Sequence, residues 1–355
     1  MSSLLVAKEY IKQIYAKNQA YIDPVLKFML AMIVFLLINA KIGYMDRIDS
    51  MTVVLVAALF CSFMPLKTIA FLGAVFMLLH YYALSLECAL VVLAMFMVMF
   101  LLYLRFAPKE TLVVLLTPIF FMLKIPYVIP VAMGLLGGPA SIVSVAFGVI
   151  ISYLVEYTEM NASTITSMGS ETMMSKLRFI LDGLIGNKAM IVTIAAFAIT
   201  LILVYIIRRM SMDYSWTVAI IVGVLADVVI LLMGDLIMDL NYNILGIIFG
   251  SVVAVALCFA VQFLFFNLDY RRTENVQFED DEYYYYVKAV PKIAVSTPDK
   301  KVKKINSKKG APARSTAHSQ VPASIKTANG VARSSAGKAR TAASADKGVK
   351  KVAKD

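Results

Sequence analysis

The chain has 355 residues, 60% of them hydrophobic and 16% charged, with a mean hydropathy of +0.79. Soluble domains are typically about 45–50% apolar and about 25% charged, so this composition excludes an ordinary soluble enzyme and predicts an all-α polytopic integral membrane protein. The formal net charge of +11 comes from the C-terminal end, because the stretch from Asp299 to Asp355 carries 15 basic and 3 acidic residues.

Residues 3–20 are predicted to form an amphipathic helix at the membrane surface. Apolar side chains such as Leu4 and Ile11 recur at helical spacing, and lysines occupy the other faces. Asp23 followed by Pro24 is typical of a helix N-cap and first helical position, so we expect the first span to begin there. Residues 1–23 are accordingly expected to be a cytoplasmic segment.

Ten apolar segments follow, and each is predicted to be a helix that crosses the bilayer, because about 20 apolar residues span the hydrocarbon core. The sixth is short and contains Pro126 and Pro130, so it is either a crossing or a re-entrant half-helix. The ten segments make up a predicted bundle over residues 24–267, and they lie near residues 24–42, 50–64, 66–84, 87–105, 110–123, 126–137, 140–157, 189–207, 215–237 and 243–267.

The distribution of basic residues favours ten spans over nine. Cytoplasmic loops carry an excess of Lys and Arg near the ends of spans. With ten spans and a cytoplasmic N-terminus, eleven such residues lie on the inner side and six on the outer side, whereas nine spans give ten and seven. We therefore expect a multi-pass protein of the plasma membrane with both termini in the cytoplasm.

Residues 158–188 are then an external loop rich in Ser, Thr and Met. Within this loop, Met173, Ile180 and Leu184 fall on one helical face, and Ser170 is a candidate N-cap. Two interpretations stay open: a helix that lies on the outer leaflet, and a lid over a pore.

Residues 268–295 are predicted to form a small cytoplasmic extension next to the membrane. Aromatic, β-favouring residues stand on both sides of Asp280 and its acidic neighbours, which predicts a β-hairpin over residues 274–290. Its edge is expected to dock a cytoplasmic protein partner, and packing of the hairpin under the bundle is the alternative. The candidate docking residues are Phe278, Tyr284 and Tyr286.

Residues 296–355 are rich in Ala, Ser, Lys and Thr and lack aromatic residues, so this tail is predicted to be disordered. Basic clusters beside a span bind anionic lipid, and control of topology and solubility is the alternative role. Nucleic acid is not an expected partner, because no aromatic residues are interleaved with the lysines. The candidate lipid contacts are Lys300, Lys301, Lys303, Lys304, Lys308 and Lys309.

No sequence motif points to an enzyme, a cofactor or a metal site, so we expect none of the three. The two histidines are too few for a histidine-rich metal site, and His80 is expected at the membrane interface. All three cysteines lie in apolar runs, which indicates buried free thiols instead of a disulfide framework. They are Cys61, Cys88 and Cys258.

Asp227 lies near the centre of the ninth predicted span. An ionisable group at lipid depth is costly and is by default a candidate functional group. It is either a proton or cation site that faces a cavity, or a carboxyl that stays protonated and bonds to a neighbouring helix. Asp235 and Asp239 follow on the same broad stripe and are expected at the outer interface.

The stretch TPIFFMLKIPYVIPVAMGLLGGPAS is the second candidate site. Prolines remove backbone donors and free carbonyl groups, which protein or cavity water must then satisfy. Discontinuous helices of this kind form substrate sites in many secondary transporters. Together with Asp227, the candidate residues are Lys124, Pro126 and Pro130; an ordinary proline-kinked helix pair is the alternative.

Small residues recur every four positions in two of the predicted spans, which predicts close helix packing within the bundle or between copies. One stripe holds Gly246 and Gly250, and the other holds Ala140, Ser144 and Gly148.

Two functions of different classes remain. The first is a secondary transporter or permease subunit for an unidentified small solute, and the second is a membrane scaffold that recruits cytoplasmic partners through its hairpin and basic tail. A water-accessible polar cavity that reaches Asp227 would favour transport, and a dry, close-packed interior would favour the scaffold.

Overall fold

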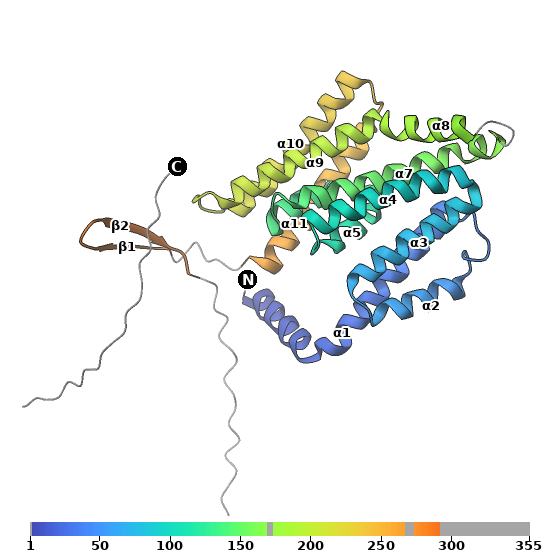
Figure 1. Cartoon of the computed structure of the whole chain (residues 1–355). Coiled ribbons are helices and arrows are strands. Elements are labelled where there is room, and N and C mark those ends of the chain that lie inside the picture. The colour runs from blue at the N-terminus through green and yellow to red at the C-terminus, as the bar shows by residue number, and fades with distance from the viewer. Residues whose placement is uncertain (1, 169–172, 267–272, 292–355) are drawn as a thin grey trace, which may run out of the picture. The chain divides into compact units, whose positions relative to one another are not determined.

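The computed structural model describes residues 2–168, 173–266 and 273–291, and 79% of these residues are helical (Figure 1). Seven helical segments are long and apolar enough to cross a membrane, judged by length and composition. Many of their outward side chains are large and apolar, as expected when the surrounding solvent is lipid. The segments are α1 (Ser2–Ile42), α3 (Leu66–Leu84), α4 (Leu86–Phe106), α7 (Ser141–Ser167), α8 (Met173–Ile185) with α9 (Lys188–Arg209), α10 (Ser215–Met238) and α11 (Ile244–Phe265).

The prediction of ten crossings is not confirmed, because three of the predicted spans are short helices. α2 (Met51–Ser62) and α5 (Thr111–Met122) have 12 residues each, and α6 (Val128–Leu136) has 9. At a rise of 1.5 Å per residue these helices are about 18 Å and about 14 Å long, well below the ~30 Å of the hydrocarbon core. α2 nevertheless runs back along α1, because Ser62 at its C-terminal end donates a hydrogen bond of 2.8 Å to the carbonyl of Pro24. The start of α1 and the end of α11 lie at the same end of the bundle, where Lys8 bonds to the carbonyl of Phe263.

α5 and α6 form a helical hairpin whose two ends lie at the same end of the bundle. At its start, Glu110 accepts a hydrogen bond of 2.6 Å from Ser141, the first residue of α7. At its close, Arg208 at the C-terminal end of α9 donates to the carbonyl of Gly137 (2.9 Å). Gly137 and Ser141 are four residues apart, so the chain enters and leaves the bundle at one place.

The tip of this hairpin lies inside the bundle. Phe121, in the last turn of α5, packs against Tyr153 and Phe197 with ring centroids 5.9 Å and 6.1 Å apart. Those two residues lie in the middle stretches of α7 and α9. α5 and α6 therefore form one hairpin that turns back within the bundle, an arrangement that agrees with the re-entrant interpretation of the sixth predicted span.

α1 consists of two helices joined at a kink, at its one non-helical position, Asn18 (φ −116°, ψ 21°). The first agrees with the helix predicted over residues 3–20, and the second begins before Pro24, earlier than the predicted span. Asp23 does not cap a helix; its carboxylate accepts hydrogen bonds from Tyr15 (2.6 Å) and Gln19 (3.3 Å). The distortion that a proline causes in a helix is thus taken up one to two turns before Pro24.

His80 lies near the C-terminal end of α3 and is fully buried by protein. Its Nδ1 accepts from the backbone N–H of Met45 (3.2 Å), so Nε2 carries the proton and donates to Asn39 (3.1 Å). The Asn39 amide in turn donates to the carbonyl of Ile48. This network holds the loop between α1 and α2 against α3 and satisfies polar groups that would otherwise be buried without partners.

Much of the predicted loop 158–188 is helical. Residues 158–167 continue α7, and α8 fills 173–185. Ile180 and Leu184 are buried in a cluster with Tyr81 and Leu154, so the predicted apolar face of α8 packs on protein. Ser170 lies outside the described residues.

The predicted β-hairpin is present as β1 (Glu274–Glu279) and β2 (Tyr284–Ala289), which pair antiparallel. Its turn is fixed by Asp280, whose Oδ1 accepts from the backbone N–H groups of Glu282 (3.0 Å) and Tyr283 (2.7 Å). These bonds lower the pKa of Asp280 below its usual value. A side chain that bonds to the backbone in this way replaces the usual Asn-Gly turn.

Candidate functional site

The tip of the α5–α6 hairpin is closed by a Schellman-type cap. Lys124 donates its backbone N–H to Phe121 (3.0 Å), and Ile125 donates to Phe120 (3.0 Å). This pattern places Lys124 at the position where glycine is usual, and its φ of 62° lies in the left-handed region. A residue with a side chain pays roughly 1–2 kcal/mol there, so the tip carries lysine at an energetic cost.

The tip is seated against α11. A Cβ atom at Gly250 would lie 2.6 Å from Cε2 of Tyr127 and 2.8 Å from the carbonyl oxygen of Lys124. Only glycine leaves room for the tip at this depth, which explains one member of the predicted small-residue stripe. The other member, Gly246, meets only Asn243 of its own helix start.

The other stripe brings α7 against α5. A Cβ atom at Gly148 would clash with the side chain of Thr117, and Ser144 is fully buried. The predicted close approach is confirmed for these two positions, and it holds the first half of the re-entrant hairpin in place.

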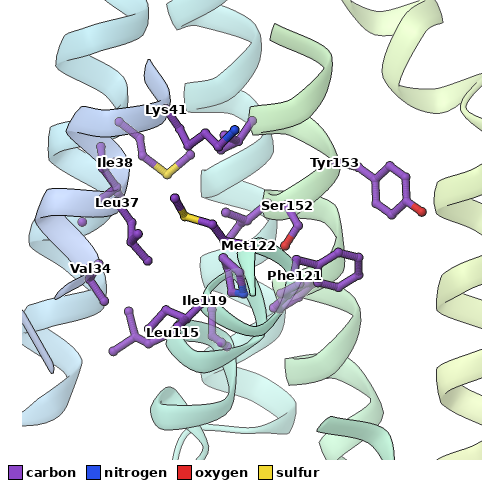
Figure 2. Close-up of a pocket in the computed structure, with 18 of the residues that line it drawn as sticks. Val34, Leu37, Ile38, Lys41, Leu115, Ile119, Phe121, Met122, Ser152 and Tyr153 are labelled. Carbon is purple, nitrogen blue, oxygen red and sulfur yellow. The ribbon is translucent and has the colours of Figure 1, made fainter. Parts of the chain in front are cut away.

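A cavity of about 1340 Å³ opens beside the hairpin. It lies between α1, α3, α4, α5 and α7, and the start of α11 adds to its wall. Figure 2 shows Val34 and Leu37 of α1 on one side, facing Leu115 and Ile119 of α5 across the space. Tyr153 points away from them, toward the neighbouring helix, and its hydroxyl bonds to Thr193 of α9 (2.9 Å).

The charges on the cavity wall are few. Lys41 forms an ion pair with Glu159 (2.9 Å), and Glu156 lies one turn along α7 from it. Lys67 stands in the first turn of α3, at an end of the bundle. Lys124 also lines the cavity, and its ammonium group has no hydrogen bond or ion pair with any residue in the described part of the chain.

Asp227 lies behind the hairpin, between α9 and α10, with none of its surface exposed. Thr200 donates a hydrogen bond of 3.2 Å to its Oδ1, while Oδ2 has no partner among the described residues. Burying a carboxyl with so little compensation is costly, so this group is the strongest polar anomaly of the bundle interior.

Tyr127 connects the two candidate sites. It lines the cavity next to Lys124, and it packs against the apolar clusters that contain Val224 and Leu231, which flank Asp227 in α10. Sequence reasoning missed this residue, although its place between Pro126 and Pro130 was a usable signal.

The predicted site residues are therefore only partly brought together. Lys124 and Pro126 line the cavity, whereas Pro130 is buried inside α6 and Asp227 does not reach the cavity wall. Asp235 has a structural role: its Oδ1 accepts from the backbone N–H of Tyr242 (2.9 Å), which fixes the turn from α10 to α11.

No family model, no curated protein and no solved structure matches this chain. Across the described residues, no group of three or more His, Cys, Asp and Glu side chains is placed to hold a metal ion. The three cysteines are free and buried, as predicted.

The β-hairpin has one apolar face and one polar face. Phe278 lies opposite Tyr285 and stacks on it with ring centroids 4.9 Å apart, and the pair Val276 and Val287 extends the same face. Tyr284 and Tyr286 lie opposite Glu279 and Gln277 on the other face. The three predicted docking residues therefore do not share one surface, because the antiparallel register pairs Phe278 with Tyr285.

Proposed function

We propose that this protein is a secondary transporter or permease subunit for a small solute, located in the plasma membrane with both termini in the cytoplasm. The cavity does not reach Asp227, so the condition that favoured transport in the sequence analysis is not met. The proposal is carried by a different observation: a helical hairpin whose tip presents Lys124 to a large cavity. Non-helical backbone inside a membrane is tolerated where it is enclosed by protein or lines a cavity, and such breaks form the binding sites of many transporters.

The orientation follows from charge. The hairpin enters at the end of the bundle where Arg208 meets Gly137, and the neighbouring Arg209 and Lys109 belong to the same end. Basic residues concentrate on the cytoplasmic side, so the hairpin enters from the cytoplasm and its tip points outward.

The two polar sites have separate roles in this proposal. Lys124 attracts the solute into the cavity, and Asp227 carries a proton while the tip is seated. When the tip moves away from α11, water reaches Asp227 and favours loss of that proton. Tyr127 lies between the two sites and transmits the movement. Binding of solute and release of a proton are thereby linked through one movable element.

An aqueous path to the tip is the property to test, because it requires no knowledge of the solute. In a background without the native cysteines, Met122→Cys places a thiol on the cavity wall, and Leu225→Cys places one on the outer face of α10. A membrane-impermeant thiosulfonate should label Met122→Cys from one side at least about tenfold faster than Leu225→Cys. If neither thiol reacts from either side, the cavity is dry and the transport proposal fails.

The scaffold is the second candidate function, and the apolar face of the β-hairpin favours it. Val276, Phe278, Tyr285 and Val287 are 37–52% exposed, and a lone two-stranded hairpin is only marginally stable in water. In this alternative the face docks a cytoplasmic protein and the basic tail beyond residue 296, which lies outside the described residues, contacts anionic lipid.

The two faces provide a matched comparison for the scaffold. Replacing Phe278 and Tyr285 with Ser removes the apolar pair, whereas replacing Tyr284 and Tyr286 with Ser changes the polar face. A partner that docks on the apolar face is lost from the purified complex with the first pair of substitutions and kept with the second. Equal effects of both pairs would contradict docking on this face.

A further inference from the structure

The wall of the cavity is suited to a hydrocarbon chain. Its volume of about 1340 Å³ exceeds the ~300–1,000 Å³ of typical small-molecule pockets. The surface offered by α3, α4 and α5 is almost entirely aliphatic and aromatic, for example at Phe71, Phe100, Leu115 and Ile119. A small hydrophilic solute would leave this surface in contact with water, whereas an apolar chain would cover it.

Two lysines of the cavity wall, Lys67 and Lys124, have no hydrogen bond or ion pair among the described residues, whereas Lys41 is paired with Glu159. Lys67 lies in the first turn of α3, at an end of the bundle, so Lys124 is the unpaired lysine at the tip of the hairpin. The Lys124 side chain is exposed on the open side of the cavity, so within a bilayer its ammonium group would face hydrocarbon without a counter-ion, which is unfavourable. The left-handed backbone adds to the cost of keeping lysine there. Both costs are explained if an anionic group of a ligand binds at Lys124.

The charge balance of the wall limits that group to one negative charge. Lys41 and Glu159 compensate each other, and the remaining charges of the wall are two lysines, Lys67 and Lys124, and one carboxylate, Glu156, which together balance a single negative charge. No arginine lines the cavity, and arginine is the residue that suits bidentate phosphate binding. A carboxylate, which carries one charge, fits one ammonium group.

We propose that the cavity binds a single-chain amphiphile with a carboxylate head, of the long-chain fatty acid class, with its head at Lys124 and its chain along α3, α4 and α5. This inference rests on the proposed function, since it names the class of solute that the hairpin tip handles.

The test measures binding of palmitate to the purified full-length protein in an uncharged maltoside detergent, by native mass spectrometry. Wild-type protein should bind one palmitate, and Lys124→Gln should weaken binding about tenfold or more, because a charge-assisted contact is lost. The control Lys188→Gln removes an exposed lysine that does not line the cavity and should bind as wild type does. Hexadecanol, which has the same chain without the charge, should bind equally to all three proteins.

A second variant guards against misfolding as the cause of a loss. Lys124→Gly removes the charge and also relieves the left-handed backbone, so this protein should fold at least as well as wild type and still lose palmitate. Undiminished palmitate binding by Lys124→Gly, or no palmitate binding by wild type, overturns the inference.

The outcome is distinguishable from that of the transport proposal. Labelling of Met122→Cys without palmitate binding leaves an aqueous path and rejects the fatty acid. Palmitate binding that depends on Lys124, with no labelling from either side, keeps the binding site and rejects transport.

Discussion

Replacing Lys124 with Gly should make the protein more stable, which is unusual for a substitution inside a membrane bundle. Lys124 has φ 62° at the closing position of the α5 cap, where a side chain costs roughly 1–2 kcal/mol. Glycine removes that cost but adds about 0.5–1 kcal/mol of unfolded-state entropy. The net gain is therefore about 0.5–1 kcal/mol, and removal of an unpaired ammonium group adds to it.

Thermal unfolding in detergent, followed by the fluorescence of the single tryptophan, Trp216, measures this effect. A gain of this size raises Tm by about 1–3 °C for a chain of this length. Lys12→Gly is the matched control, because Lys12 is exposed within a helix, where glycine costs about 1 kcal/mol. A Tm that falls for Lys124→Gly, as it should for Lys12→Gly, would refute the assignment of strain to the tip.

Gly250→Ala should lower Tm by several degrees, because the added methyl group meets the ring of Tyr127 and the backbone of the tip. Asp227→Asn should change Tm little, since an amide keeps a donor and an acceptor. The same substitution should abolish proton-linked uptake in liposomes, and uptake at the wild-type rate would exclude a coupling role for Asp227. His80→Leu should destabilise the fold by about 2–4 kcal/mol in denaturant titrations, because two buried partners lose their hydrogen bonds. The pKa of Asp280 is lowered in the folded turn, and the stability that such a group supplies is lost as the pH falls through its folded pKa. The amide protection of the β-hairpin turn should therefore persist as the pH falls through the usual range for Asp and disappear only below it. Hydrogen exchange on the full chain measures this protection.

The sequence identified where the apolar helices lie better than how they cross the bundle. The predicted span 66–84 agrees with α3 (Leu66–Leu84), and the hairpin around Asp280 was found from its aromatic residues. The sequence counted α5 as a crossing and left α6 open between a crossing and a re-entrant half-helix, because apolar composition indicates the environment of a segment and not the path of the chain through it. Tertiary hydrogen bonds hold the two ends of the α5–α6 hairpin together: Ser141 donates to Glu110, and Arg208 donates to the carbonyl of Gly137.

In the candidate site too, residues with a local sequence signal were found, and residues whose role depends on tertiary structure were not. Lys124 and Pro126 were recognised because prolines and a lysine inside an apolar run are local signals. Tyr127 lies in the same proline-rich stretch but was not singled out. Thr200 gave no local signal, because its importance comes from where α9 places it beside Asp227. The pairing of Phe278 with Tyr285 depends on strand register, which is fixed by the turn geometry at Asp280.

The re-entrant hairpin has a consequence for mapping the protein in its membrane. A pair of helices that returns to its starting side does not change the side of the membrane on which the following chain lies. Reporter fusions at either terminus therefore give the same signal whether α5 and α6 cross the membrane or turn back within it. Of the basic residues near span ends, Lys124 alone changes its place between the two arrangements, from an outer loop to the interior. The excess of positive charge on the cytoplasmic side therefore becomes larger with the re-entrant hairpin. A probe at residue 124 that reports depth in the membrane distinguishes the two arrangements, whereas probes that report only the side of the membrane do not.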